Sequence, residues 1–271
     1  MSKPIRHYNL FIYDCRMLSK VNKYLFFILM TAFGITFFTK DNYRNVDEIV
    51  PPVLKKPVQK KPANMDGINF INNDYEYELV PLYDYEIAGL VVHRMDYSWF
   101  SIYKGDSVFP LDLCMIWGSN AENKIYQSRS LSFSQDMRFC FYRWWGNVKF
   151  NQQEVSNNHL LINSEEIEKK IRNISTGDQV KIKGQLVNVR AKNLGTPGTY
   201  DPEFFEWNTS VSRTDTGGGA CEVILVNEVY MLEKANTVSH HIYKNSFYGL
   251  IILICTNIVW FFVKLTRSNF F

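Results

Sequence analysis

Two uncharged apolar runs, one near each end, constrain this chain more than any other feature. The first covers the 16 residues from Tyr24 to Thr39, and the second covers the 19 residues from Asn245 to Val263. A helix needs roughly 17–25 such residues to cross a bilayer. The first run reaches that length when Val21 and Asn22 are added and Lys23 extends its amine to the interface. The pattern predicts transmembrane helices at 24–39 and 245–263, with the lipid bilayer as a partner.

Each run has one alternative interpretation. The first is a cleaved signal peptide, and the second is a buried helix of a soluble domain. Against cleavage, the residues from Thr36 to Lys40 contain no small-x-small site. Tyr248, Trp260 and Phe261 lie near the ends of the second run, where aromatic side chains anchor spanning helices at the bilayer surface. These features favour two spanning helices.

The basic residues outside the two runs predict the orientation. Residues 1–23 contain five lysines and arginines against one acid, and residues 264–271 contain two against none. Lys and Arg are enriched on the cytoplasmic side of membrane proteins, so we expect both basic tails in the cytoplasm. The segment between the helices is then outside. For a bacterial inner-membrane protein, which we expect this to be, outside means the periplasm.

The segment between the helices is slightly acidic. Residues 40–245 carry a net charge of −3, so the formal +3 of the whole chain comes from its two tails. A nucleic-acid partner is not expected, because nucleic-acid-binding domains present basic surfaces. The sequence also contains no phosphate-binding loop and no metal-ligand spacing, so neither a cofactor nor a metal site is predicted.

Residues 40–67 are predicted to be a linker. Within them four prolines are interleaved with four lysines: Pro51, Pro52, Pro57, Pro62, Lys55, Lys56, Lys60 and Lys61. Such a composition favours extended polyproline conformations and makes a semi-rigid spacer. The folded domain outside the membrane is therefore expected at 68–234.

The stretch from Asn163 to Gly177 has the pattern of an amphipathic helix. Asn163 and Ser164 are both suitable N-caps, and Glu166 stands three residues after Asn163, as a capping box requires. Isoleucines recur at 167, 171 and 174 with helical spacing. Gly177 provides a stop, because glycine tolerates the left-handed conformation that often ends a helix.

Two long strands are expected after this helix. From Gly177 to Val189 apolar and polar residues alternate, with a slip near Gly184 that predicts a bulge or bend. From Ala220 to Leu232 apolar residues occupy both sides, which predicts a central strand. We expect these two to be antiparallel neighbours. Three earlier strands are expected at 83–94, 111–117 and 138–145.

The expected order of three strands, one helix and two strands is that of an OB-fold. The segment from Gly177 to Gly184 is similar to the Gly-Asp-x-Val-x-Val-x-Gly strands of OB-like and related small barrels. Residues 156–160 and 212–217 resemble uncharacterised bacterial membrane-anchored proteins. That resemblance covers residues 83–232 and implies no activity. The predicted fold class is mainly β with one helix, as an OB-like small barrel in the loop between two transmembrane helices.

The cysteines of the outer domain permit two interpretations. Cys114, Cys140 and Cys221 lie there, whereas Cys15 and Cys255 belong to the first tail and the second span. All three stand among apolar residues, where a free thiol packs as a small hydrophobe. A Cys114–Cys140 disulfide is the alternative if the compartment is oxidising.

Four residues are candidates for a binding site. Arg213 and Asp215 precede the glycines at 217–219, whose backbone amides suit an anion, although a flexible loop with an Arg213–Asp215 pair is the plainer expectation. His159 would need a nucleophile within reach to act as a base. Trp207 lies in the long connection between the last two strands and is expected to dock on the domain or on a partner.

The sequence favours a binding function over an enzymatic one. No Gly-x-Ser-x-Gly elbow or other catalytic motif is present, so no catalytic residue is assigned. We expect the outer domain to bind a protein or envelope partner. The alternative is a membrane-anchored hydrolase that uses His159 and Asp215. An enzyme requires these two residues to converge on one cleft, whereas a binder requires an exposed apolar patch.

The expected orientation predicts how reporter fusions behave. A reporter enzyme that is active only outside the cytoplasm should be active when fused after Lys60 and inactive when fused after Phe271, because the positive tails stay inside. Reporter activity is measured in intact cells, with the amount of each fusion checked by immunoblot. An inactive fusion at Lys60 together with an active one at Phe271 would reverse the orientation.

Overall fold

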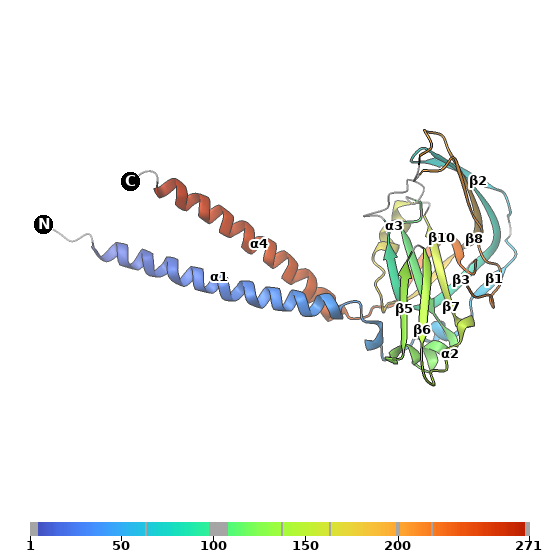
Figure 1. The fold of residues 1–271 in the computed structure, drawn as a ribbon, viewed down its shortest axis with the longest axis horizontal. Helices are drawn as coiled ribbons and strands as arrows, with labels where there is room; N and C mark the ends of the chain where they lie inside the picture. Colours follow the sequence, from blue (N-terminus) through green and yellow to red (C-terminus); the bar gives the residue numbers. More distant parts are fainter. Residues whose placement is uncertain are drawn as a thin grey trace. The chain divides into compact units, whose positions relative to one another are not determined.

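The computed structural model describes residues 5–62, 64–97, 108–136, 138–162, 164–198, 201–217 and 219–268. The protein is mostly sheet with a few helices, and two apolar helices lie at the ends of the chain (Figure 1). The chain divides into two compact units. One contains residues 1–41 and 236–271, and the other contains residues 42–235.

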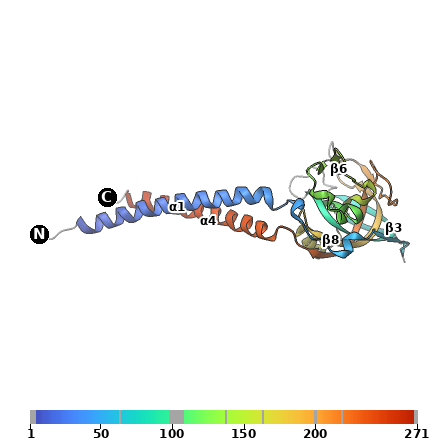
Figure 2. The same ribbon diagram turned by 90° about the horizontal axis from the view of Figure 1, so that it is seen from below.

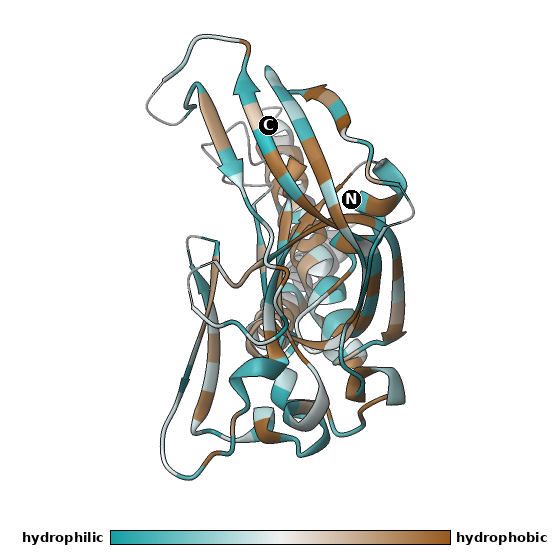
Figure 3. Ribbon diagram, turned by 90° about the vertical axis from the view of Figure 1, so that its right-hand side faces the viewer, coloured by the Kyte–Doolittle hydropathy of each residue, from teal (hydrophilic) through white to brown (hydrophobic). Residues whose placement is uncertain are grey.

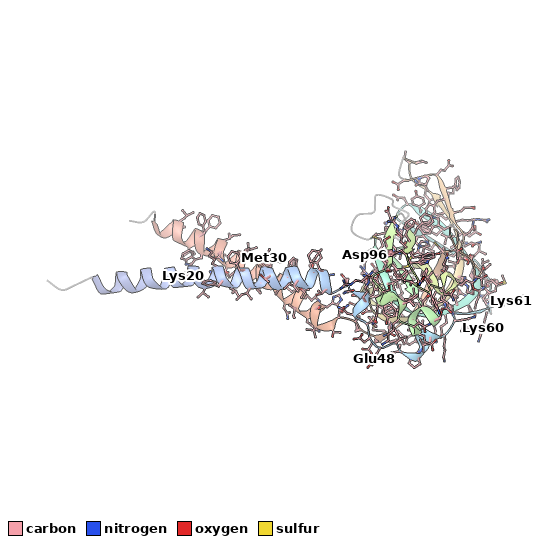
Figure 4. The ribbon with its side chains drawn as sticks, turned by 60° about the horizontal axis from the view of Figure 1, so that its bottom comes forward. Lys20, Met30, Glu48, Lys60, Lys61 and Asp96 are labelled. Atoms are coloured by element: carbon pink, nitrogen blue, oxygen red, sulfur yellow. A yellow bond between two sulfur atoms is a disulfide. The ribbon has the colours of Figure 1, made fainter. Side chains whose placement is uncertain are left out.

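Helices α1 (Ile5–Thr39) and α4 (Thr237–Ser268) form the first unit. Each contains a stretch long and apolar enough to cross a membrane, at Lys20–Thr39 and Thr237–Val263. Most side chains of these stretches are exposed, such as Met30 on α1 (Figure 4). The helices contact one another through the stacked rings of Phe33 and Tyr243. The two apolar helices expected from the sequence are therefore present, and both extend beyond the predicted runs.

The described residues of the second unit form ten strands. They are β1 (Val58–Lys60), β2 (Ile68–Asn72), β3 (Tyr75–Asp96), β4 (Leu111–Ile116), β5 (Leu131–Asp136), β6 (Phe139–Trp144), β7 (Val155–Leu161), β8 (Gln179–Asn193), β9 (Phe204–Trp207) and β10 (Glu222–Glu233). The α-helices of this unit are α2 (Gly118–Glu122) and α3 (Glu165–Arg172). Short 3-10 helices occur at η1 (Tyr43–Asn45), η2 (Pro51–Leu54), η4 (Ile125–Gln127) and η5 (Gln152–Glu154).

Five of these strands pair in a cycle. β3 pairs with β4, β4 with β7, β7 with β10, β10 with β8, and β8 again with β3. Only β7 and β10 are parallel. β1 and β2 extend the sheet beside β3, β9 extends it beside β8, and β5 with β6 forms a separate hairpin (Figures 1 and 2). The antiparallel pairing expected for the last two long strands is confirmed by β8 and β10.

Apolar and polar residues alternate along the strands, seen as brown and teal bands in Figure 3. One buried apolar cluster joins all five strands of the cycle to α3; its members include Ile87, Leu113, Leu160, Ile171, Ile182 and Ile224. A second cluster fills the space between β3, β4 and the β5–β6 hairpin, and includes Val92, Ile116, Leu131 and Phe133. The hairpin therefore covers the opposite side of β4 from α3.

Helix α3 begins as the capping pattern of its sequence predicts, but it ends at Arg172, before the stop expected at Gly177. Ser164 is the N-cap, and its hydroxyl accepts a hydrogen bond of 3.3 Å from the backbone N–H of Ile167. Asn163, the other candidate cap, lies outside the described residues. The apolar face of the helix, with Ile167 and Ile171, is buried against the strands.

The irregularity expected at Gly184 lies in the partner strand. The β8–β10 register shifts between Val226 and Glu228, so the extra residue belongs to β10 and not to β8. Gly184 serves a different purpose: a Cβ at this position would lie 2.1 Å from the carbonyl oxygen of Leu225. The absence of a side chain lets β10 approach β8 closely at the bulge.

Residues 40–67 pack against the domain, in contrast to the linker predicted for them. Val53 is fully buried, and Tyr43 and Val46 join the second apolar cluster. β1 pairs with β3. Lys60 and Lys61 of this segment are exposed (Figure 4), while Tyr43, Val46 and Val53 are buried. The folded unit therefore starts at residue 42.

The close approach at Gly184 predicts a selective loss of stability. Gly184→Ala forces a methyl group against the Leu225 carbonyl, and overpacking of this kind costs about 1–3 kcal/mol. Gly198→Ala is the matched control, because a Cβ there meets nothing within 4 Å. Thermal unfolding of the full-length chain in detergent measures both variants. Equal unfolding midpoints for the two would contradict the packing at Gly184.

Candidate functional site

The side of β4 and β7 that faces the hairpin carries a row of polar and sulfur-containing residues. Asp112 of β4 lies in register with His159 of β7, and Cys114 lies in register with Asn157. On the other side of β7, Val223 of β10 is in register with His159. Because side chains alternate, Cys221 emerges on the same side as Val223, next to Asn157. The side chains of Asp112, Cys114, Asn157 and His159, with that of Cys221 just before β10, therefore lie on one side of the sheet.

Asp112 lies at the centre of a buried charge cluster. Its side chain is fully buried, and its Oδ1 atom lies 3.0 Å from Arg138 Nη1 and 3.0 Å from His159 Nδ1. The Arg138 contact is a hydrogen bond. The His159 contact is an ion pair when the ring is protonated. One carboxylate therefore faces two cationic groups in a site that excludes water, which compensates for its burial.

Aromatic rings enclose the Arg138 guanidinium. Its central carbon lies 3.5 Å from the centre of the Tyr97 ring and 5.3 Å from the Trp207 ring. Trp207 also contacts His159, with ring centroids 5.1 Å apart. Arg138 has a positive φ of 68° in the turn between β5 and β6. That conformation, uncommon for a residue with a side chain, directs the guanidinium back onto β4.

His159 is held in its charged form. Burial acts to lower the pKa of His159, but the Asp112 carboxylate outweighs burial, and with a smaller contribution from Cys221 the pKa rises to about 9. At neutral pH the ring is therefore an imidazolium.

Asn157 connects the cluster to the cysteines. Its Nδ2 donates to the carbonyl oxygen of Arg138 at 2.6 Å and to Cys221 Sγ at 3.6 Å. Its Oδ1 accepts a hydrogen bond of 2.7 Å from Gln135 of the hairpin. The structure joins Cys114 to Cys140 of β6 by a disulfide and leaves Cys221 as a free thiol. The hairpin is thus tied to β4 covalently and to β7 through an amide.

A groove of about 460 Å³ opens beside this row. Its walls are β6, the start of β7 and the loop before β10; the lining residues are Phe139, Cys140, Phe141, Tyr142, Gln152, Val155, Ser156, Asn157, Asp215, Thr216, Gly217, Ala220 and Cys221. Four consecutive residues of β6 line it. Since neighbouring side chains point to opposite faces of a strand, such a run lines a groove only where the edge of the strand borders it.

Both strands that border the groove have an edge without a strand partner. Among the described residues β6 pairs with β5 alone. Residues 155–157 of β7 pair with β4 on one side, but the β10 pairing on the other side begins only at Asn158. The groove therefore lies beside two strand edges that have no strand partner among the described residues.

Arg213 and Asp215 do not form the pair expected from their spacing. Arg213 forms its ion pair with Glu222 and donates a 3.0 Å hydrogen bond to the Tyr85 hydroxyl. Asp215 accepts a hydrogen bond of 2.5 Å from the Ser210 hydroxyl. Glu222 is buried, and burial raises its pKa to about 7 despite the neighbouring Arg213. Glu222 pairs with Arg213 because a buried carboxylate requires a counter-charge more than the exposed Asp215 does.

The four predicted site residues thus fall into three places. His159 and Trp207 meet in the charge cluster, Asp215 lines the groove, and Arg213 reaches Glu222. Trp207 also stacks on Phe109 at 4.5 Å, so its predicted docking on the domain is confirmed.

Sequence reasoning missed two residues of the site, Asp112 and Arg138, and the contact of Cys221 with Asn157. A single acid inside the apolar run Leu-Asp-Leu-Cys-Met-Ile was the available signal for Asp112.

Comparison with protein-family models, with curated proteins and with solved structures found no match to this chain. The function is therefore argued from the geometry. Asp215 lines the groove and His159 does not. The convergence on one cleft that a hydrolase using this pair requires is therefore not observed.

The His159–Asp112 attraction predicts a pH-dependent stability. The folded-state pKa of about 9 exceeds the ordinary 6.5, so the stabilisation is complete below pH 6.5 and is lost as the pH rises through 9. We expect wild type to exceed His159→Gln in stability by about 3 kcal/mol more at pH 6 than at pH 10. Denaturant unfolding of the full chain in detergent measures this difference. A difference that is constant with pH would refute the charged pair.

Proposed function

We propose that this protein is an inner-membrane protein with both termini in the cytoplasm. Its OB-like barrel, outside the cytoplasm, binds an extended segment of a protein partner. The apolar helices at both ends and the basic tails support this topology. The cycle β3-β4-β7-β10-β8 supports the barrel, because its five strands follow the OB order, with α3 between the third and fourth.

The groove between β6 and β7 is the observation that carries the binding function. An extended peptide adds to a sheet where a strand edge is unpaired, gaining affinity from backbone hydrogen bonds and specificity from side-chain pockets. Residues 139–142 and 155–157 offer two such edges on opposite walls. An extended segment that pairs with either of these edges would gain backbone hydrogen bonds.

The side chains around the groove indicate the chemistry of the bound segment. Phe139 and Phe141 are 44% and 46% exposed, which is high for aromatic rings on a covered hairpin. They offer contacts to apolar side chains of an added strand. Polar groups of Gln152, Ser156 and Asp215 lie on the same lining. A segment of alternating apolar and polar residues from an envelope protein fits this pattern.

Photocrosslinking at the groove tests this function. A photoreactive phenylalanine analogue placed at Phe141 of the full-length protein is expected to give a discrete adduct with a polypeptide in intact cells. Placed at Ile71, which is 67% exposed on β2 away from the groove lining, it should give none. Adducts are detected by immunoblot, and protease treatment separates polypeptide adducts from lipid adducts.

A variant that fills the groove provides a second test of this function. Ala220→Trp places a large ring in the groove and should abolish the Phe141 adduct while leaving the thermal unfolding midpoint near that of wild type. Equal adducts at positions 141 and 71, or an adduct that survives Ala220→Trp in a folded protein, would exclude the groove as the binding site.

A further inference from the structure

The three cysteines of the domain gather around one asparagine. Cys114 lies in register with Asn157 on the neighbouring strand, and Cys221 Sγ lies 3.6 Å from Asn157 Nδ2. Cys140 is bonded to Cys114 from the hairpin above. Cys140 and Cys221 both line the groove, whereas Cys114 is fully buried. A free thiol and one sulfur of a disulfide therefore face the same space.

The surroundings of Cys221 suit a nucleophilic thiol. A thiolate is stabilised by a neighbouring imidazolium and by N–H donors. His159 supplies the first: it lies diagonally across from Cys221 on the neighbouring strand, and it pairs with Asp112. Asn157 supplies the second through Nδ2. The strand register alone places Cys221 diagonally across from His159, two residues before its direct partner Val223.

We propose that Cys221, Cys140 and Cys114 form a thiol–disulfide exchange site. The Cys221 thiolate attacks Sγ of Cys140, because that sulfur lines the groove. The Cys140–Cys221 bond forms as the Cys114–Cys140 bond breaks. Cys114 leaves as a thiolate and takes up the proton that Cys221 released to solvent. The number of disulfides is unchanged, so the step requires neither an oxidant nor a reductant.

The exchange moves the covalent attachment of the hairpin. In the observed state β6 is tied to β4, and after exchange it is tied to the residue that precedes β10. This chemistry uses residues of the groove but does not rest on a polypeptide binding there. His159 and Asp112 are positioning residues in this scheme, since they act through Cys221.

Disulfide mapping tests the proposal in the full-length chain. Cys15→Ser and Cys255→Ser leave only the three cysteines of the domain. Trypsin separates them into the peptides 105–124, 139–143 and 214–234, so each disulfide gives a distinct linked pair. After incubation at neutral pH, acid quenching and alkylation, mass spectrometry should find the 139–143 peptide linked to both others. Cys221→Ser should show the link to 105–124 alone.

A second variant forces the alternative bond. Cys114→Ala removes the leaving sulfur, and Cys140 and Cys221 should then join fully in a glutathione buffer that also oxidises the parent. His159→Gln should slow formation of this bond, whereas a purely structural histidine would leave the rate unchanged. Tryptophan fluorescence checks that each variant is folded. Absence of the Cys140–Cys221 link from both the parent and a folded Cys114→Ala chain would overturn the proposal.

Discussion

The buried carboxylate of Asp112 determines how one side of the domain is built. An isolated carboxylate without solvent costs many kcal/mol, so a fold that buries one must bring counter-charges to it. His159 comes from the neighbouring strand, in register. Arg138 comes from the tip of the hairpin, 26 residues along the chain, through a turn of positive φ. The charge therefore fixes the position of the hairpin relative to β4.

The position of the hairpin in turn creates the groove. Arg138 holds the start of β6 above β4, and the disulfide from Cys140 fixes the next part of the strand. Between β6 and β7 the contact at this end is the Asn157 side chain, which bonds the backbone of Arg138 in place of a strand ladder. The two strands are close but unpaired, and a groove beside two edges that have no strand partner among the described residues is the result. The apolar cluster under Leu131 and Phe133 supports the other end of the hairpin.

Local pattern in the sequence predicts some of the elements, because local rules govern them. The third strand of the cycle is β7, at Val155–Leu161, and not the strand expected at 138–145, where β6 forms the separate hairpin with β5. Helix α3 and the β8–β10 pair follow from capping, spacing and alternation, and the docking of Trp207 follows from the apolar content of its connection. Contacts between distant residues are not visible in this way. Proximity in sequence predicts Asp215 as the partner of Arg213, but the observed partner is Glu222, a buried acid nine residues away. The prolines and lysines of residues 40–67 predict a linker, but Val53 of this segment is buried in the core.

The loop before β10 shows how such long-range contacts position the reactive groups. The glycines of this loop suggest a flexible backbone, but hydrogen bonds and an ion pair hold the chain on either side of them. The Thr209 hydroxyl accepts a hydrogen bond of 3.0 Å from the Val223 amide, and the Ser210 amide donates to the Cys221 carbonyl at 2.8 Å. Arg213 adds the buried ion pair to Glu222. The residues on both sides of Cys221 are therefore fixed to the sheet by backbone contacts and by a charge. The Cys221 thiol is held at the groove beside Asn157 and His159 by its surroundings, even though glycines precede it in the sequence.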